Sequence, residues 1–273
     1  MESLPHCETL LLKKQGPTLF ITINRPDVRN AMSLQMVAEL ATIFSQIESD
    51  LHIRAVVIRG ADGHFCAGGD IKDMAGARSQ KAAEGEADPF YRLNRAFGQM
   101  IQQVNESSKV VIAVTEGAVM GGGFGLACVS DMAIAGPTAK FGMPETSLGV
   151  IPAQIAPFVV ERIGLTQARR LALLGLRIGA EEARTLGIVH QAAGSDQELD
   201  EMLDHALERV RQCAPVATAE TKALLHRVGH EAMSGLLDSA AEKFAEAIRG
   251  SEGAEGTMAF MQKRPPAWAG DSE

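Results

Sequence analysis

The stretch VVIAVTEGAVMGGGFG, residues 110–125, decides the fold class of this chain. It begins with an apolar run typical of a buried strand and ends in glycines that we expect to open a helix over residues 121–129. The same order of strand, glycine-containing loop and helix recurs over residues 55–74, where residues 55–58 form the strand. Strands that alternate with helices predict an α/β layered domain.

The segments on either side agree with this prediction. Residues 9–13 and 18–23 read as two strands of a hairpin, and Ser33 is placed to cap a helix with apolar residues at helical spacing. A further helix is expected over residues 90–104. Residues 75–89, rich in alanine, glycine and charge, predict a mobile surface loop.

The chain changes character near residue 195, after which only helical patterns follow. They cover residues 199–212, 216–228, 233–248 and 256–261. We therefore divide the chain into an α/β core domain, residues 1–194, and a helical C-terminal region, residues 195–273. That region is suited either to cover the core as a lid or to mediate oligomerisation, and the sequence does not distinguish the two.

Composition excludes several classes of function. The 273 residues carry a net charge of −8 and only 4% aromatic residues. A nucleic-acid partner is therefore not expected, because such proteins usually carry a basic excess and stacking aromatic side chains. No stretch reads as a membrane span or a signal peptide, and the four cysteines are far apart, so we expect a cytoplasmic protein.

A metal site is not expected either. His226 and His230 are four residues apart on a predicted helix and could share one face, but no third ligand accompanies them. The interpretation as two solvated side chains is favoured.

Three local features suggest chemistry. Two glycine-containing turns, residues 65–72 and 116–125, each follow a buried strand. Glycine lets backbone N–H groups approach a ligand closely, and two such groups aimed at one point form an oxyanion hole, although glycines in such turns are more often purely geometric. Glu145 adds a carboxylate in a Gly/Pro turn, where it suits either acid/base catalysis or a structural ion pair.

These features, taken together, resemble the crotonase (enoyl-CoA hydratase/isomerase) superfamily. The matching segments follow the family's order along nearly the whole chain: Asn24–Pro26, Asn30–Met32, Phe65–Lys72, Gly121–Gly123, Ser130–Ala135, Phe141–Glu145, Leu148–Gly149, 180–189 and Phe260–Arg264. The resemblance implies a spiral of repeated ββα units with a helical C-terminal region, and a homotrimer or dimer of trimers. It implies an acyl-CoA substrate and no separate cofactor, since coenzyme A enters with the substrate.

The resemblance also assigns roles residue by residue. Backbone N–H groups at Gly69 and Gly122 match the family's oxyanion hole, and Glu145 matches the second of the two glutamates of a standard hydratase. The positions that match contacts with the CoA moiety are Ala67, Gly69, Asp70, Ile71, Lys72, Arg29 and Lys263, the last reaching CoA across a subunit boundary. For Arg29, Lys72 and Lys263, an ordinary exposed charge is an equally good interpretation.

Two differences from the usual family pattern indicate which members of the family this sequence resembles most. Gly125 stands where the first glutamate would be, and residues 151–160 lack the usual glycine-rich run. In both respects the sequence resembles bacterial hydratases that act on branched glutaconyl-CoA thioesters. The resemblance is greatest to hydratases of isohexenylglutaconyl-CoA, followed by those of methylglutaconyl-CoA. The sequence thus predicts a CoA-thioester lyase. Enoyl-CoA isomerases, which also lack the first glutamate, and a non-catalytic scaffold of the same fold are the alternatives.

Overall fold

The large sheet organises the molecule. The computed structural model describes residues 4–79 and 85–270, and its larger sheet has the strand order β1-β2-β3-β4-β6-β9. Strands β1 and β2 form the expected antiparallel hairpin, and every later neighbour is parallel. The bounds are β1 Leu10–Gln15, β2 Thr18–Ile23, β3 Ala55–Gly60, β4 Val110–Thr115, β6 Met132–Ala135 and β9 Gln191–Ala192.

A second, smaller sheet lies beside the first and makes the chain a spiral. It consists of β5 (Ala118–Met120), β7 (Lys140–Gly142) and β8 (Arg177–Gly179). Isolated parallel bridges, Cys66 with Val119 and Met32 with Gly69, extend it toward the N-terminal repeats. Successive repeats therefore contribute to the large sheet, then to the small one, and then to a helix, which confirms the α/β spiral with a helical C-terminal region.

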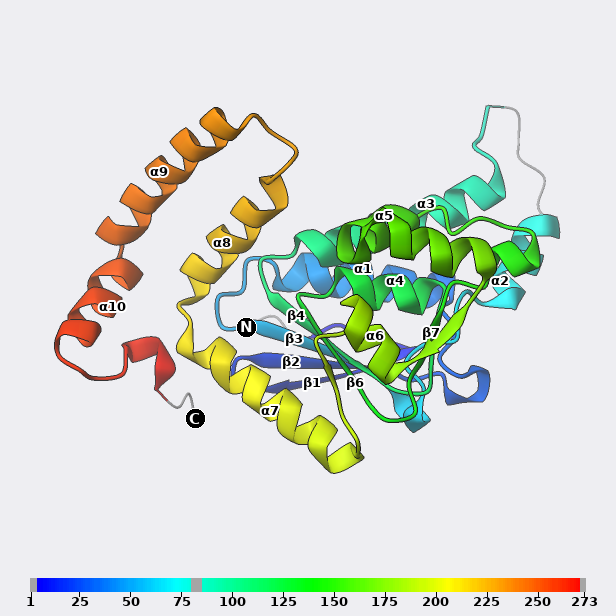
Figure 1. Ribbon diagram of the computed structural model, residues 1–273, viewed down its shortest axis with the longest axis horizontal. Helices are drawn as coiled ribbons and strands as arrows, with labels where there is room; N and C mark the ends of the chain where they lie inside the picture. The colour runs from blue at the N-terminus through cyan, green and yellow to red at the C-terminus, as the bar shows by residue number, and fades with distance from the viewer. Residues whose placement is uncertain (1–3, 80–84, 271–273) are drawn as a thin grey trace.

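Helices cover both faces of the large sheet. Along β3 and β4, alternate residues such as Val56 and Val111 belong to one core, and Val57 and Ile112 to the other. The helices are α1 Leu34–Ile47, α2 Ile71–Ser79, α3 Pro89–Glu106, α4 Gly122–Val129, α5 Ala156–Leu174, α6 Ala180–Leu186, α7 Asp196–Gln212, α8 Pro215–Arg227, α9 Met233–Arg249 and α10 Ser251–Met261. Helices α1, α3, α4 and α5 lie on one face, and α7 lies across the other (Figure 1).

Local sequence explains where the helices begin. The Ser33 hydroxyl accepts the Met36 N–H at 3.2 Å, so it caps α1 as predicted. The Asp88 carboxylate accepts the N–H groups of Phe90 and Tyr91, and Pro89 takes the first helical position of α3. These caps satisfy N–H groups that have no partner inside the helix.

The loop expected over residues 75–89 is partly wrong. Residues 75–79 belong to α2, which begins at Ile71, because the Asp70 carboxylate accepts the Lys72 N–H at 2.8 Å and so stabilises the first turn. Residues 80–84 lie outside the described part of the chain, and residues 85–88 lead into α3.

The histidine pair is not a pair on one helix. Helix α8 ends at Arg227, so His226 is in its last turn and His230 lies in the turn that follows. No group of three or more His, Cys, Asp or Glu side chains suited to a metal ion occurs within the described residues. None of the described helices combines the length and apolar character that a membrane span requires.

The helical C-terminal region divides into two parts. Helix α7 packs on the sheet through Leu199, Leu203 and Leu207, so it belongs structurally to the core. Helices α8, α9 and α10 extend away from the core, at the end of the molecule opposite α2 (Figure 1). Within one chain these three helices do not cover the α2 end.

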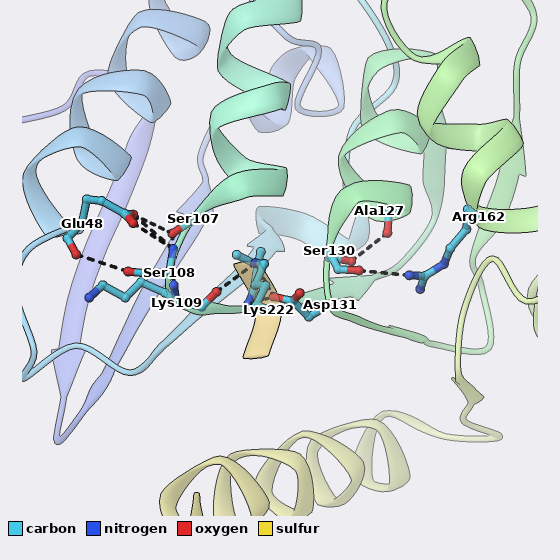
Figure 2. A network of polar contacts seen from close by, with 10 residues as sticks. Glu48, Ser107, Ser108, Lys109, Ala127, Ser130, Asp131, Arg162 and Lys222 are labelled. Atoms are coloured by element: carbon cyan, nitrogen blue, oxygen red, sulfur yellow. Dashed lines mark hydrogen bonds and ion pairs between the residues drawn. The ribbon is translucent and has the colours of Figure 1, made fainter. Parts of the chain in front are cut away.

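An ion pair between buried Lys222 and partly exposed Asp131 fastens this arm, helices α8–α10, to the sheet. Lys222 of α8 donates to the Asp131 carboxylate at 2.7 Å and to the Lys109 carbonyl at 3.1 Å, between the strands β4 and β6 (Figure 2). The same Asp131 oxygen accepts the Val111 N–H at 2.7 Å. The Lys222 side chain is 10% exposed and that of Asp131 31%, while Lys109 is buried, so water can replace the cation at Asp131 more easily than the donor at the Lys109 carbonyl.

Replacing Lys222 tests this attachment. We expect Lys222→Met to lower the free energy of unfolding by about 2 kcal/mol, because Asp131 loses its cation and the Lys109 carbonyl loses a donor. Chemical denaturation measures the change. Arg170→Met, which removes an exposed ion pair with Glu182, is the control and should cost less than about 1 kcal/mol. Equal losses in the two variants would contradict the assignment.

Candidate active site

The two glycine turns named in the sequence meet in space. Gly68 and Gly121 both have positive φ, +104° and +50°, a backbone conformation that side chains disfavour. A Cβ atom on Gly121 would lie 3.7 Å from the Gly68 Cα atom and 2.9 Å from Glu145 Oε1. Glycine at these positions therefore lets the two turns and the carboxylate crowd around one point.

The bridge pattern sets the direction of the Gly69 N–H group. Met32 donates to the Gly68 carbonyl at 2.8 Å and accepts from the Asp70 N–H at 2.9 Å. In a parallel ladder, this leaves the N–H of Gly69 pointing away from Met32. On that opposite side Cys66 is bridged to Val119, so the Gly69 N–H points toward the strand that leads into Gly121.

The Gly122 N–H group completes a pair. Gly122 is the first residue of α4, where an N–H has no partner inside the helix. Neither it nor the Gly69 N–H donates a hydrogen bond to any described residue. Both groups border the space between the Gly68–Gly69 turn and the Gly121–Gly122 turn, which we call the gap. Two unbonded N–H groups at this gap can bind an oxygen atom as negative charge develops on it, which is the function of an oxyanion hole.

Glu145 lies over the same gap, at the start of a short 3-10 helix, Glu145–Leu148, that follows β7. Its Oε1 atom lies beside Gly121, and its Oε2 atom is buried without a hydrogen-bond partner among the described residues. Burial raises the pKa of this carboxyl above its ordinary value. A carboxyl of this kind, held near a site for a polarised carbonyl, is suited to accept and return a proton.

The position of the first glutamate is closed by an apolar side chain. A Cβ on Gly125 would lie 2.2 Å from Ile155 Cγ2 and 3.0 Å from Ile101 Cδ1. The two departures from the family pattern, Gly125 and the unusual run over residues 151–160, therefore meet in the structure. Ile155 of that run occupies the space in which a side chain at position 125 would stand. Glu145 is the one carboxylate that the sequence assigned to this gap, and the structure leaves no room for a second at Gly125.

Apolar side chains lie around the gap; the sequence did not single out Phe97 or Met74, whereas Met32 belongs to the matching segment Asn30–Met32. The ring of Phe97 and the sulfur of Met32 would lie 3.3 and 3.5 Å from a Cβ on Gly122, and the Met74 methyl 2.8 Å from one on Gly69. Phe97 follows the apolar spacing of α3, but that spacing equally suits the core. The contact between Phe97 and the glycine turn at Gly122 is visible only in the tertiary structure.

The segment predicted to contact CoA lies mainly on the surface. Ile71 is 80% exposed, and Gly69, Lys72 and Arg29 are exposed as well. The Ala67 N–H donates to the Arg29 carbonyl at 3.1 Å, which places the Arg29 loop beside this segment. These residues are accessible to a ligand that approaches the Gly69 end of the gap.

Asp70 has a different place. Its carboxylate is 7% exposed and pairs with Arg25 at 2.6 Å, besides capping α2. Burial acts to raise its pKa, yet the hydrogen bond and charge of Arg25 hold the pKa below the ordinary value. Asp70 therefore fixes the backbone next to Gly69, while its predicted contact with CoA stays a prediction.

Arg25 and Asn30, part of the quoted N-terminal segments, support the same turn. Arg25 also donates to the carbonyl of Ala31. Asn30 is fully buried; it accepts the Arg25 N–H at 2.8 Å and donates to the His64 carbonyl at 2.6 Å. The sequence showed these residues as a match but not as the support of the Gly68–Gly69 turn.

Lys263 lies far from this gap within one chain. It follows α10, whereas Gly69 and Lys72 lie at the α2 end of the molecule (Figure 1). Its predicted contact with CoA therefore requires a second copy of the chain.

Comparison with known proteins shows the family of this chain. The family model of Enoyl-CoA hydratase/isomerase matches residues 13–271, and the chain belongs to that family. It therefore acts on CoA thioesters as an enoyl-CoA hydratase-type enzyme.

Three similar proteins illustrate the match. An enoyl-CoA hydratase/isomerase from Marinobacter aquaeolei is 85% identical with a TM-score of 0.95, covering 97% of this chain and 100% of its own. Pseudomonas aeruginosa AtuE is 56% identical with a TM-score of 0.93, covering 96% and 100%. The 2,3-dehydroadipyl-CoA hydratase of Escherichia coli strain K12 is 30% identical, covering 96% of this chain and 98% of its own.

Glu145→Gln tests the acid/base assignment. We expect kcat to fall by about 10²–10⁴-fold, because the amide cannot accept the proton. In the unchanged protein, kcat should fall as pH is lowered through a pKa above the ordinary glutamate value of 4.5, since the ionised form is the base.

The stability of the Glu145→Gln variant gives an independent check, because the change that lowers kcat should not lower the free energy of unfolding. A raised pKa in the folded state means that ionised Glu145 opposes folding, so this cost is absent below about pH 4 and present at neutral pH. Glu145→Gln should therefore unfold no more easily than the unchanged protein at pH 7. Unchanged turnover in this variant would remove Glu145 from the mechanism.

Proposed function

We propose that this protein hydrates a branched, 3-substituted glutaconyl-CoA, and that its preferred substrate is isohexenylglutaconyl-CoA, an intermediate of acyclic terpene degradation. Such a thioester carries a double bond conjugated to the carbonyl and a second carboxylate on the acyl chain. The proposal rests on the family, on the departures at Gly125 and residues 151–160, and on the single carboxylate at the gap.

The contact between Ile155 and Gly125 is the observation that carries the proposal. It leaves Glu145 as the matched acid/base group, with its Oε2 atom buried and unpartnered. A substrate that brings its own carboxylate adds negative charge near the site. Binding it beside two glutamates would cost more than binding it beside one, because like charges in a poorly solvated site repel strongly.

The proposed reaction uses the two N–H groups and the Glu145 carboxylate. The thioester oxygen accepts the N–H groups of Gly69 and Gly122, which draws electrons away from the conjugated double bond. Glu145 accepts a proton from water while the water oxygen bonds to C3, and the electron pair moves to the thioester oxygen as an enolate. The proton then passes from Glu145 to C2, which regenerates the carboxylate and the carbonyl.

A relative's name supports the substrate class. The Escherichia coli protein described above is named for an enoyl thioester of adipic acid, a dicarboxylic acid. Methylglutaconyl-CoA, of leucine catabolism, is the second substrate of the same class.

An enoyl-CoA isomerase is the alternative that a specific observation favours. One carboxylate is enough to move a proton along an acyl chain, and Gly125 leaves one here. The unbonded N–H groups of Gly69 and Gly122 and the buried Glu145 carboxyl both count against a non-catalytic scaffold.

We also propose a cytoplasmic homo-oligomer, a trimer or a dimer of trimers. All four cysteines are free thiols, which suits a reducing compartment. Helices α8–α10 expose large apolar side chains that favour burial against other copies of the chain. They include Leu225, Met233, Leu237, Phe244, Phe260 and Met261.

Hydration assays decide between these functions. We expect turnover of isohexenylglutaconyl-CoA and, more slowly, of methylglutaconyl-CoA, with kcat/KM for straight-chain crotonyl-CoA at least about tenfold lower. In ¹⁸O-labelled water, hydration places the label in the product hydroxyl, whereas an isomerase moves the double bond without the label. Efficient turnover of crotonyl-CoA with no glutaconyl activity would overturn the proposed substrate.

Gly125→Glu tests the observation that carries the proposal. We expect the variant to lose about 2–3 kcal/mol of stability, because Ile155 and Ile101 occupy the space that the new side chain needs. Adding Ile155→Ala should recover part of that loss. Gly76→Glu is the control, since a Cβ there meets nothing within 4 Å. A fully stable Gly125→Glu variant in thermal and chemical unfolding would contradict the closed position.

A further inference from the structure

A polar cluster joins α3 to the loop before α5. Gln154 donates from Nε2 to Asn94 Oδ1 at 2.8 Å, and its Oε1 atom accepts from Arg95 Nη1 at 3.4 Å. All three side chains are half-buried. Gln154 thus holds two neighbouring α3 side chains in fixed positions.

The hydrogen bonds inside this cluster occupy its acceptor atoms and leave several of its donor groups without a partner among the described residues. The side-chain oxygens of Gln154 and Asn94 are both occupied, whereas Asn94 Nδ2 and the remaining N–H groups of Arg95 have no partner among the described residues. Arg95 has no acidic partner there either, in contrast to Arg92, which pairs with Glu86 at 3.2 Å. A half-buried group of unmatched donors with one positive charge suits an anion.

The cluster adjoins the active site through two direct neighbours. Gly98 makes room for it, since a Cβ there would lie 1.8 Å from Gln154 Oε1 and 2.9 Å from Arg95 Nη1. The residue before Gly98 is Phe97, whose ring lies against Gly122, and the residue after Gln154 is Ile155, which covers Gly125. Asn94 and Gln154 therefore lie next to the residues that line the gap, and Arg95, which Gln154 holds, also lines the groove between α1 and α3, where Glu48 and Glu106 lie as well.

We propose that Asn94, Arg95 and Gln154 form a subsite for a carboxylate at the far end of the acyl chain. Arg95 and Asn94 donate to the carboxylate, and Gln154 is a positioning residue that orients both. A guanidinium suits this role because its N–H groups match the two oxygens of a carboxylate. The inference rests on the proposed function, since it names the residues that select a dicarboxylic acyl group.

Binding of saturated thioesters tests the subsite without the reaction. Glutaryl-CoA and pentanoyl-CoA have the same chain length and differ by the terminal carboxylate. We expect the unchanged protein to bind glutaryl-CoA at least about tenfold more tightly in calorimetric titrations, as hydrogen bonds to a charged group predict. Equal affinity for the two thioesters would overturn the subsite.

Variants locate the effect. Arg95→Met should reduce the preference for glutaryl-CoA to less than about twofold and leave the affinity for pentanoyl-CoA unchanged, which also shows that the variant is folded. Arg92→Met, one turn earlier on α3 and already paired, is the matched control and should keep the full preference. Gln154→Leu should lower the preference only partly. A full preference in Arg95→Met would overturn the assignment.

The outcomes separate this inference from the proposed function. If the unchanged protein prefers glutaryl-CoA but hydrates no glutaconyl thioester, the subsite stands and the proposed reaction fails. If it hydrates glutaconyl thioesters while Arg95→Met keeps the preference for glutaryl-CoA, the reaction stands and the subsite fails.

Discussion

The close approach of the Gly68–Gly69 turn to the Gly121–Gly122 turn is the contact on which the active site depends. It requires two positive-φ glycines, because a Cβ on Gly121 would crowd the Glu145 carboxylate. The parallel sheet brings the two turns to one edge, and the bridges at Met32 and Cys66 fix the direction of the Gly69 N–H. Arg25, Asn30 and Asp70 then hold the first turn in place from behind. The pair of unbonded N–H groups at Gly69 and Gly122 is thus a property of backbone geometry, and the side chains of Arg25, Asn30 and Asp70 act as its support.

Of the two glutamates that a standard hydratase has at this gap, the chain keeps one, Glu145. Ile155 fills the position above Gly125, so the site gains an apolar wall where a second glutamate would stand. The same run of residues supplies Gln154, which joins Asn94 and Arg95 into a donor cluster. Under the proposed function, the missing carboxylate and the guanidinium held by Gln154 would both favour binding of an anionic substrate. One short segment therefore supplies both the side chain that closes the space at Gly125 and the side chain that holds Asn94 and Arg95.

The C-terminal helices depend on a separate anchor. Lys222 reaches from α8 to Asp131 and Lys109, and Arg162 of α5 donates to the Ser130 carbonyl at 3.1 Å close by (Figure 2). The turn at Ser130–Asp131 therefore holds both α5, whose start lies over the site, and the arm that extends from the core. Beyond Lys222, the arm places its large apolar side chains on the surface of the single chain.

Local sequence determined the elements, and tertiary contacts decided the site. The strands of β2, β3 and β4, the cap at Ser33 and the helix after Gly121 were readable because apolar spacing, capping and glycine act over a few neighbouring residues. A helix at the end of residues 55–74 was expected, but its continuation over residues 75–79 was missed, because alanine, glycine and charged residues there favoured a loop. Glu145 was found by its family position, but its buried, unpartnered oxygen is visible only in the fold. The closure of Gly125 by Ile155, and the meeting of Arg95 with Gln154, join residues 30 and 59 positions apart, a separation at which sequence spacing carries no information about contact.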